Sequence, residues 1–244
     1  MRLDNQAEQR QRDYYAAHAD EYEDKHLSDD DEHMRALAMF RGLALGRDHA
    51  SILDVGAGTG RGLRFLQQVF PTSKVIGVEP SSDLREIGHA AGLKQSDLVD
   101  GDATKLPFAA NEFDWVIETG VLHHIKDYKA AVSEMCRVAR VGVLISDSNN
   151  MGQGSFLARL FKRTLKALGL WNAFLWLQTG GKMYKFSEGD GVYFSFCAFD
   201  TVPILQQKFG RIIYANTASA GFNLYGSAAT IAIIALDPKS QMEV

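Results

Sequence analysis

Residues 51–62, with the sequence SILDVGAGTGRG, decide the fold. The stretch begins with a short apolar run around Asp54, which is typical of a buried strand in a parallel sheet. Four glycines then alternate, and residues 63–69 have the apolar spacing of a helix. Glycine lets the backbone turn tightly and approach a ligand closely. The stretch therefore predicts a strand, a glycine loop and a helix, which is where an open α/β sheet binds a nucleotide-like ligand.

Acidic residues follow the next strands as well. Residues 74–78 are a second apolar run that ends in Glu79 and Pro80. A carboxylate about 20 residues after the glycine loop is where a dinucleotide-binding fold contacts the ribose. Further strands are expected before Asp102, over residues 113–119 and over residues 141–147, with helical stretches between them. This alternation predicts βαβ units and a parallel sheet.

The spacing of the glycines helps to distinguish between two kinds of cofactor. A nicotinamide dinucleotide normally requires G-x-G-x-x-G, but the residue three after Gly58 is Arg61, and the pattern here is G-x-G-x-G. A carboxylate at Asp54 would repel a pyrophosphate and suits a cationic amino acid or a hydroxyl. A dinucleotide remains the competing interpretation.

In this order the motifs resemble those of class I S-adenosylmethionine-dependent methyltransferases over residues 48–147. The resemblance rests on LDVGAGTG at 53–60, VEPS at 78–81, GDA at 101–103, and FD at 113–114 through LHH at 122–124. It implies a Rossmann-like, doubly wound α/β fold with helices on both faces. The sheet would have seven strands, mostly parallel, with an antiparallel last strand. The implied cofactor is S-adenosyl-L-methionine.

The resemblance also implies individual cofactor contacts. The glycine loop would pass beneath the methionine part, with Asp54 near its amino group, and Glu79 would accept hydrogen bonds from both ribose hydroxyls. Asp102 would meet the adenine edge, and Glu118 would lie near the sulfur. Carboxylates suit a sulfonium cation, and two hydroxyls match the two oxygens of one carboxylate. The implied set is Asp54, Gly56, Ala57, Gly58, Gly60, Glu79, Pro80, Asp102, Ala103, Glu118, Thr119 and Tyr15.

Composition fits one domain of this kind. The chain has 244 residues and a net charge of −4, so it has no global basic field for nucleic acid. Cys136 and Cys197 are far apart and lack the spacing of a zinc site, so we expect free, buried thiols in a reducing cytoplasm. The start has no apolar signal region, and no run of about 18 apolar residues occurs. These features predict a soluble, cytoplasmic protein of unknown oligomeric state.

The domain divides into four expected parts: an N-terminal helical cap (1–47), a cofactor-binding core (48–147), a substrate-lid insertion (148–209) and closing strands (210–238). In the resembled family the cap folds over the cofactor. Tyr14, Tyr15 and Tyr22 are therefore candidates for contact, with Tyr15 the best of them. Packing of one tyrosine face on the domain is the alternative for each.

The insertion has the most individual sequence. Residues 148–187 contain six Lys and Arg residues and no Asp or Glu, with apolar residues at helical spacing between 156 and 168. One interpretation is a lid that selects an anionic or aromatic substrate, such as a sugar phosphate, a lipid-linked glycan or a quinone-like metabolite. A second is a plain helical cap whose apolar face covers the sheet. A third is peripheral contact with an anionic membrane.

Two histidines are the candidate catalytic residues. His123 and His124 follow the fourth strand at the carboxyl edge of the sheet, where one of them could face the transferred methyl group. Imidazole is the best-matched base near neutral pH, although paired histidines also position loops. Asp147 is a candidate for substrate contact or for orienting a histidine, and no metal site is predicted.

These inferences predict methyl transfer to the oxygen or nitrogen of a small-molecule acceptor. The alternative is a catalytically silent protein that binds S-adenosylmethionine or acts as a scaffold through the basic, aromatic insertion.

Overall fold

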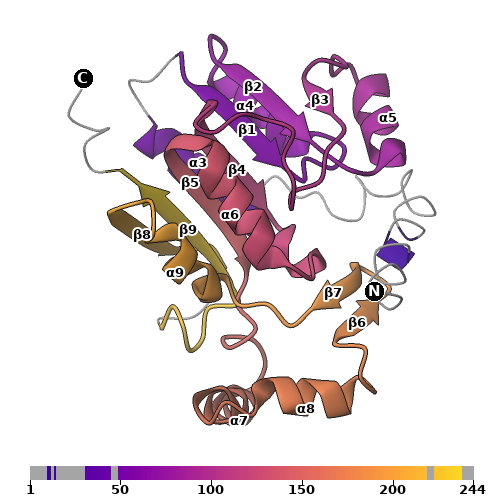
Figure 1. Cartoon of the computed structure of the whole chain (residues 1–244), viewed down its shortest axis with the longest axis vertical. Helices are drawn as coiled ribbons and strands as arrows, with labels where there is room; N and C mark the ends of the chain where they lie inside the picture. The colour runs from indigo at the N-terminus through magenta and orange to yellow at the C-terminus, as the bar shows by residue number, and fades with distance from the viewer. Residues whose placement is uncertain (1–9, 12–13, 15–30, 45–48, 219–222, 238–244) are drawn as a thin grey trace.

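A seven-stranded sheet forms the centre of the computed structural model, which describes residues 10–11, 14, 31–44, 49–218 and 223–237 (Figure 1). The strand order is β3-β2-β1-β4-β5-β9-β8. The strands are β1 (Ser51–Val55), β2 (Lys74–Val78), β3 (Leu98–Val99), β4 (Phe113–Thr119), β5 (Ala139–Ser148), β8 (Arg211–Asn216) and β9 (Thr230–Leu236). The main helices are α3 (Glu32–Leu43), α4 (Arg61–Val69), α5 (Ser82–Ala90), α6 (Tyr128–Val138), α7 (Phe156–Ala167), α8 (Trp171–Gln178) and α9 (Val202–Leu205).

The strand directions confirm the predicted fold class. The first five strands pair in parallel, whereas β9 is antiparallel to both of its neighbours, β5 and β8. All seven residues of β9 are buried, in keeping with its mostly apolar sequence. After β1 the chain builds outward to β3 and then returns to place β4 on the other side of β1. Such a switch point opens a crevice at the carboxyl ends of these strands.

Helices cover both faces of the sheet. On one face Leu37 and Phe40 of α3 pack with Leu66 of α4 against Ile52 and Trp115. The opposite face is covered by α6 and α9, whose buried side chains include Val132, Met135 and Leu205. Figure 1 shows α6 and α9 on the near side of the sheet. Burying both faces explains why the central strands are nearly all apolar.

The N-terminal part of the chain is described mainly through α3. Asp31 caps this helix by accepting hydrogen bonds from the backbone N–H groups of His33 and Met34. The candidates Tyr15 and Tyr22 lie outside the described residues. Tyr14 is buried, and its hydroxyl donates a hydrogen bond to the carbonyl oxygen of Glu188, 2.9 Å away.

The segment 148–209 holds α7, α8 and a hairpin that the sequence did not predict, formed by β6 (Tyr184–Ser187) and β7 (Gly191–Phe194). Helices α7 and α8 lie together at one end of the molecule, apart from the seven-stranded sheet (Figure 1). The interpretation of α7 as a cap with its apolar face on the sheet is wrong, because none of its residues is buried.

The two cysteines and the hydropathy of the helices were also considered in the sequence. Cys136 and Cys197 are free and buried, as predicted. Among the described residues, no helix has both the length and the hydropathy that crossing a bilayer requires.

Candidate active site

The glycine loop between β1 and α4 forms the floor of the candidate site. Gly56 has φ +71°, and a Cβ atom there would lie 2.3 Å from Cγ2 of Val121. Gly60, the N-cap of α4, has φ +85°. Both positions therefore require glycine for conformation and for space, since a Cβ atom at Gly60 would lie 2.1 Å from Cδ1 of Leu93. The backbone N–H of Gly56 donates to the carbonyl oxygen of Val78, which ties the loop to the end of β2.

Glu79 follows β2 and is 6% exposed. Its Oε2 accepts a hydrogen bond from the backbone N–H of Gly58 at 3.1 Å, and its Oε1 accepts one from Ser81 at 2.9 Å. Burial raises the pKa of this carboxyl, while the two backbone donors act against the rise. Glu79 is thus fixed by its backbone partners in one orientation beside the glycine loop.

A cavity of about 750 Å³ opens at the carboxyl ends of β1, β2 and β4. Most of the residues assigned to the cofactor by resemblance meet in this one cavity. Those that line it are Gly56, Gly58, Glu79, Pro80, Asp102, Ala103 and Thr119.

Asp54 lies beneath the loop, not on the cavity wall. It is 2% exposed, and a Cβ atom at Gly62 would lie 3.0 Å from its Oδ2. Burial, together with the charge of Glu79, raises the pKa of Asp54 to about 7, although Arg61 acts in the opposite direction. Ala57 and Gly60, in the same loop, are also absent from the residues that line the cavity.

Asp102 and Glu118 lie in contrasting surroundings. Asp102 is exposed, and its Oδ1 accepts hydrogen bonds from the N–H and the hydroxyl of Thr104. Glu118 is fully buried; its Oε2 accepts from the N–H of Val121, and its Oε1 has no partner among the described residues. Burial raises the pKa of Glu118 well above its usual value, with the charge of Asp147 adding to the rise. Burial and the charge of Asp147 therefore both favour the neutral form of the Glu118 carboxyl group.

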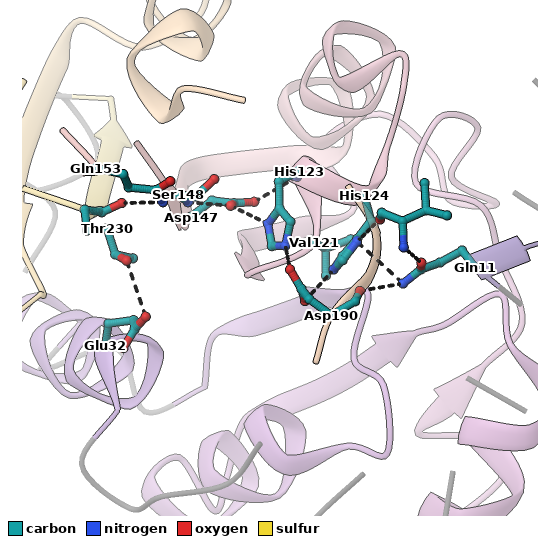
Figure 2. Close-up of polar contacts among 12 residues, drawn as sticks. Gln11, Glu32, Val121, His123, His124, Asp147, Ser148, Gln153, Asp190 and Thr230 are labelled. Atoms are coloured by element: carbon teal, nitrogen blue, oxygen red, sulfur yellow. Dashed lines mark hydrogen bonds and ion pairs between the residues drawn. The ribbon is translucent and has the colours of Figure 1, made fainter. Parts of the chain in front are cut away.

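Both candidate histidines lie on a short 3-10 helix, η2 (Leu122–His124), and point toward Asp190 (Figure 2). His123 Nδ1 is 2.7 Å from Oδ1 of Asp147, as expected if Asp147 orients a histidine, and His123 Nε2 is 3.3 Å from Oδ2 of Asp190. His124 Nε2 is also 3.3 Å from Asp190, through Oδ1. Its Nδ1 lies 2.6 Å from the carbonyl oxygen of Val192, so this nitrogen carries the donated proton.

The two carboxylates decide the charge of His123. Burial lowers the pKa of His123, but Asp147, with Asp190 on the other side of the ring, holds it well above its usual value. Hydrogen bonds from both histidines in turn hold the pKa of Asp190 below its ordinary range, against the effect of burial. The two carboxylates therefore favour the protonated, imidazolium form of His123. Ligand atoms of His123, His124 and Asp190 lie within 4.8 Å of one another, close enough to hold a metal ion, although the sequence predicted none.

A second cavity of about 540 Å³ adjoins the first. His123 lines the second cavity, His124 lines the first, and Phe194 of β7 contributes to both. Aromatic side chains and two lysines from the segment 148–209 form part of the second wall. They are Lys162, Trp171, Lys185, Tyr193, Phe194 and Phe196.

Known proteins share both the core sequence and the fold. Residues 53–146 match the family model described as "Methyltransferase domain". A demethylmenaquinone methyltransferase of Staphylococcus aureus is 37% identical over 102 residues, which cover 41% of this chain and 42% of that protein. This chain contains a methyltransferase domain. The family match and the strand order both agree with the resemblance to class I S-adenosylmethionine-dependent methyltransferases.

Solved structures support the same fold for this methyltransferase domain. A methyltransferase from Thermotoga maritima aligns over 92% of this chain and 98% of its own length, with TM-score 0.59 and 17% identity. Phosphoethanolamine N-methyltransferase 2 of Haemonchus contortus, in complex with S-adenosyl-L-methionine, aligns over 84% of this chain and 52% of its own length, with TM-score 0.57 and 18% identity. The chain aligns with less than half of the length of the curated relatives it matches.

Sequence reasoning missed three polar residues of the site. Asp190, Gln11 and His33 are not among the candidate residues predicted above. Gln11 Oε1 accepts a hydrogen bond from the N–H of Val192, and its Nε2 donates to the carbonyl oxygen of Asp190 (Figure 2). His33 Nδ1 lies 3.0 Å from the hydroxyl of Ser146. The acids around Gly189 were a visible signal for Asp190, but no local pattern marks Gln11 or His33.

Proposed function

We propose that this methyltransferase domain transfers the methyl group of S-adenosyl-L-methionine to oxygen or nitrogen of a small-molecule acceptor. The observation that carries the proposal is the pair of adjoining cavities separated by His123, His124 and Phe194. The cavity at the glycine loop would hold the cofactor, and the cavity at Asp147 and Asp190 would hold the acceptor. Methyl transfer is an in-line displacement, so two sites meeting at one boundary suit it.

The residues around the first cavity fit this cofactor. When bound, S-adenosylmethionine supplies an electrophilic methyl group on a positively charged sulfur. The remaining lone pairs of Glu79 are available to the two ribose hydroxyls, because its backbone donors use one acceptor position on each oxygen. Asp54 lies nearby beneath the loop as a buried acid that a cationic amino group would stabilise in its ionised form.

The histidine pair acts on the acceptor through Asp190 in this proposal. Because Asp147 and Asp190 favour the protonated form of His123, this histidine is a poor base and serves as a positioning residue. Asp190 remains ionised, is 49% exposed at its side chain and lines the acceptor cavity. It would accept a hydrogen bond from the hydroxyl or amine of the acceptor and aim the attacking lone pair at the methyl group.

An acceptor with an aromatic or quinone-like ring fits the second cavity best. Trp171, Phe194 and Phe196 offer ring faces and edges, while Lys162 and Lys185 favour an acidic or carbonyl-bearing compound. The similarity to a demethylmenaquinone methyltransferase supports a quinone-like acceptor. We also propose that residues 148–209 form the acceptor-binding insertion and that residues 1–47 form the cap. We further propose a cytoplasmic location, because the free, buried thiols suit a reducing compartment.

Release of S-adenosylhomocysteine in the presence of soluble quinol, phenol and amine acceptors tests the function. Trp171→Ala should raise KM for the acceptor about tenfold or more, because it removes an aromatic wall worth roughly 1.5 kcal/mol. Cofactor affinity should stay unchanged. Trp176→Ala is the matched control, since Trp176 is 57% exposed and does not line the cavity. No turnover with any acceptor despite cofactor binding would contradict the proposal, as would stabilisation by a nicotinamide dinucleotide in place of S-adenosylmethionine.

A further inference from the structure

Helix α7 has its polar face turned toward the protein and its apolar face turned outward. Lys166 forms an ion pair with Asp200, with Nζ–Oδ1 2.6 Å. Lys162 donates hydrogen bonds to the carbonyl oxygens of Asn150 and Gln153. On the other side, Phe156 is 63% exposed and Leu157 74% exposed. A surface helix of a globular protein normally has the opposite orientation.

The exposed apolar area continues onto α8. The ring of Phe174 packs on Phe161 with centroids 5.4 Å apart and stacks on Trp171 at 5.5 Å, which joins the two helices. Leu175 is buried and fixes α8 to the rest of the protein, but Trp176 and Leu177 remain exposed. We call Phe156, Leu157, Leu160, Phe161, Trp176 and Leu177 the α7–α8 surface. Large exposed apolar side chains on two helices that pack together mark a binding face.

Charge indicates what this face binds. Residues 148–187 carry six of the 26 Lys and Arg residues and none of the 30 Asp and Glu residues. The rest of the chain therefore has 20 cations against 30 acids. A symmetric dimer through this face would bring the same positive segment of both copies together, which disfavours a second copy as the occupant. Tryptophan, phenylalanine and leucine flanked by lysine and arginine match the interface of an anionic bilayer.

We propose that the α7–α8 surface docks on an anionic membrane surface. The apolar side chains enter the boundary between head groups and acyl chains, and the net positive charge of residues 148–187, which includes the exposed Lys182, attracts anionic head groups. Trp171 and Leu175 of α8 also line the acceptor cavity, so docking brings that cavity next to the bilayer. Docking itself requires no methyl transfer, and it is tested separately from the proposed function.

Sedimentation of the full chain with phosphatidylcholine vesicles, with and without phosphatidylglycerol, tests the proposal. We expect binding to the anionic vesicles that weakens with added salt. The double variant Leu157→Glu/Leu177→Glu should reduce the partition coefficient at least about tenfold. Met39→Glu/Leu43→Glu is the matched control, because it adds the same two charges at exposed apolar residues of α3. Its binding to vesicles should equal that of the unmodified protein.

A second readout follows the tryptophans. Brominated lipids should quench the fluorescence of the unmodified protein, and Trp176→Phe should remove most of the quenching, since Trp115 is buried and Trp171 is only partly exposed. Cofactor titrations on the same samples show whether each variant is folded. They also distinguish a loss of membrane docking from a loss of the methyltransferase function. Absent binding to anionic vesicles, or equal binding by the double variant, would overturn the proposal. So would a dimer in solution that the double variant dissociates.

Discussion

Glu79→Gln isolates the charge that the proposed site presents to the cofactor ribose. The substitution keeps the shape of the side chain. The buried carboxylate accepts hydrogen bonds from Gly58 and Ser81 and has one further acceptor position on each oxygen for a hydroxyl. Losing one hydrogen bond to a charged group removes roughly 1.5–3 kcal/mol, which corresponds to a weakening of S-adenosylmethionine binding by about 10- to 150-fold.

Isothermal titration with S-adenosylmethionine and S-adenosylhomocysteine measures this loss, and both ligands should lose affinity to a similar extent because they share the ribose. Glutamine is preferable to alanine, since alanine would leave both buried backbone donors unsatisfied, whereas the amide nitrogen of glutamine leaves only one of them without an acceptor. Glu86→Gln is the control, because Glu86 is exposed on α5. Isotherms of Glu79→Gln that match the unmodified protein would refute the assignment of Glu79 to the ribose.

Two further predictions concern the loop and the histidine pair. Gly56→Ala should lower Tm by several degrees and weaken cofactor binding at least about tenfold, since the new Cβ meets Val121 and the left-handed backbone adds roughly 1–3 kcal/mol of strain; an unchanged thermal melt would contradict this. In the unmodified protein, proton NMR should place the pKa of His123 above its usual value of about 6.5. Since the folded-state pKa is the higher one, the stability that His123 contributes is fully present below pH about 6.5 and is lost as pH rises through the raised value. Asp147→Asn should bring the His123 resonance back toward its ordinary range and flatten this part of the stability profile in urea unfolding; an unshifted titration would show that Asp147 does not set the charge.

The parts predictable from sequence are those that one local stretch specifies. The strand, glycine loop and helix over residues 51–69 lie next to one another along the chain, and their residue types leave few alternative conformations. Glu79 was predictable because it ends a strand that is parallel to β1 and adjacent to it. Continuous apolar runs likewise indicated the buried strands, down to the interior position of β9.

The acceptor side could not be predicted in this way, because its contacts join distant segments. Asp190 reaches His123 only through the β6–β7 hairpin, and Gln11 supports that hairpin by bonding to Val192. Helical periodicity in α7 showed that the helix has two faces but not which face turns inward. The orientation depends on partners such as Asp200 that lie far along the chain.

The two regions with proposed ligands are also those where the protein alone leaves unfavourable features. At the glycine loop, Asp54 and Glu79 are buried acids with raised pKa values, which a bound cation would return toward ionisation. At the α7–α8 surface, large apolar side chains remain in contact with water. Neither arrangement stabilises the folded protein by itself. Apolar residues in place of Asp54 and Glu79 would avoid the cost of burying acids. Turning α7 around would avoid the cost of exposing its apolar side chains to water. Sequences depart from such local consistency chiefly at functional sites. A cationic cofactor would explain the buried acids, and an anionic bilayer would explain the exposed apolar surface. Because the two explanations rest on different chemistry, each can be tested without the other.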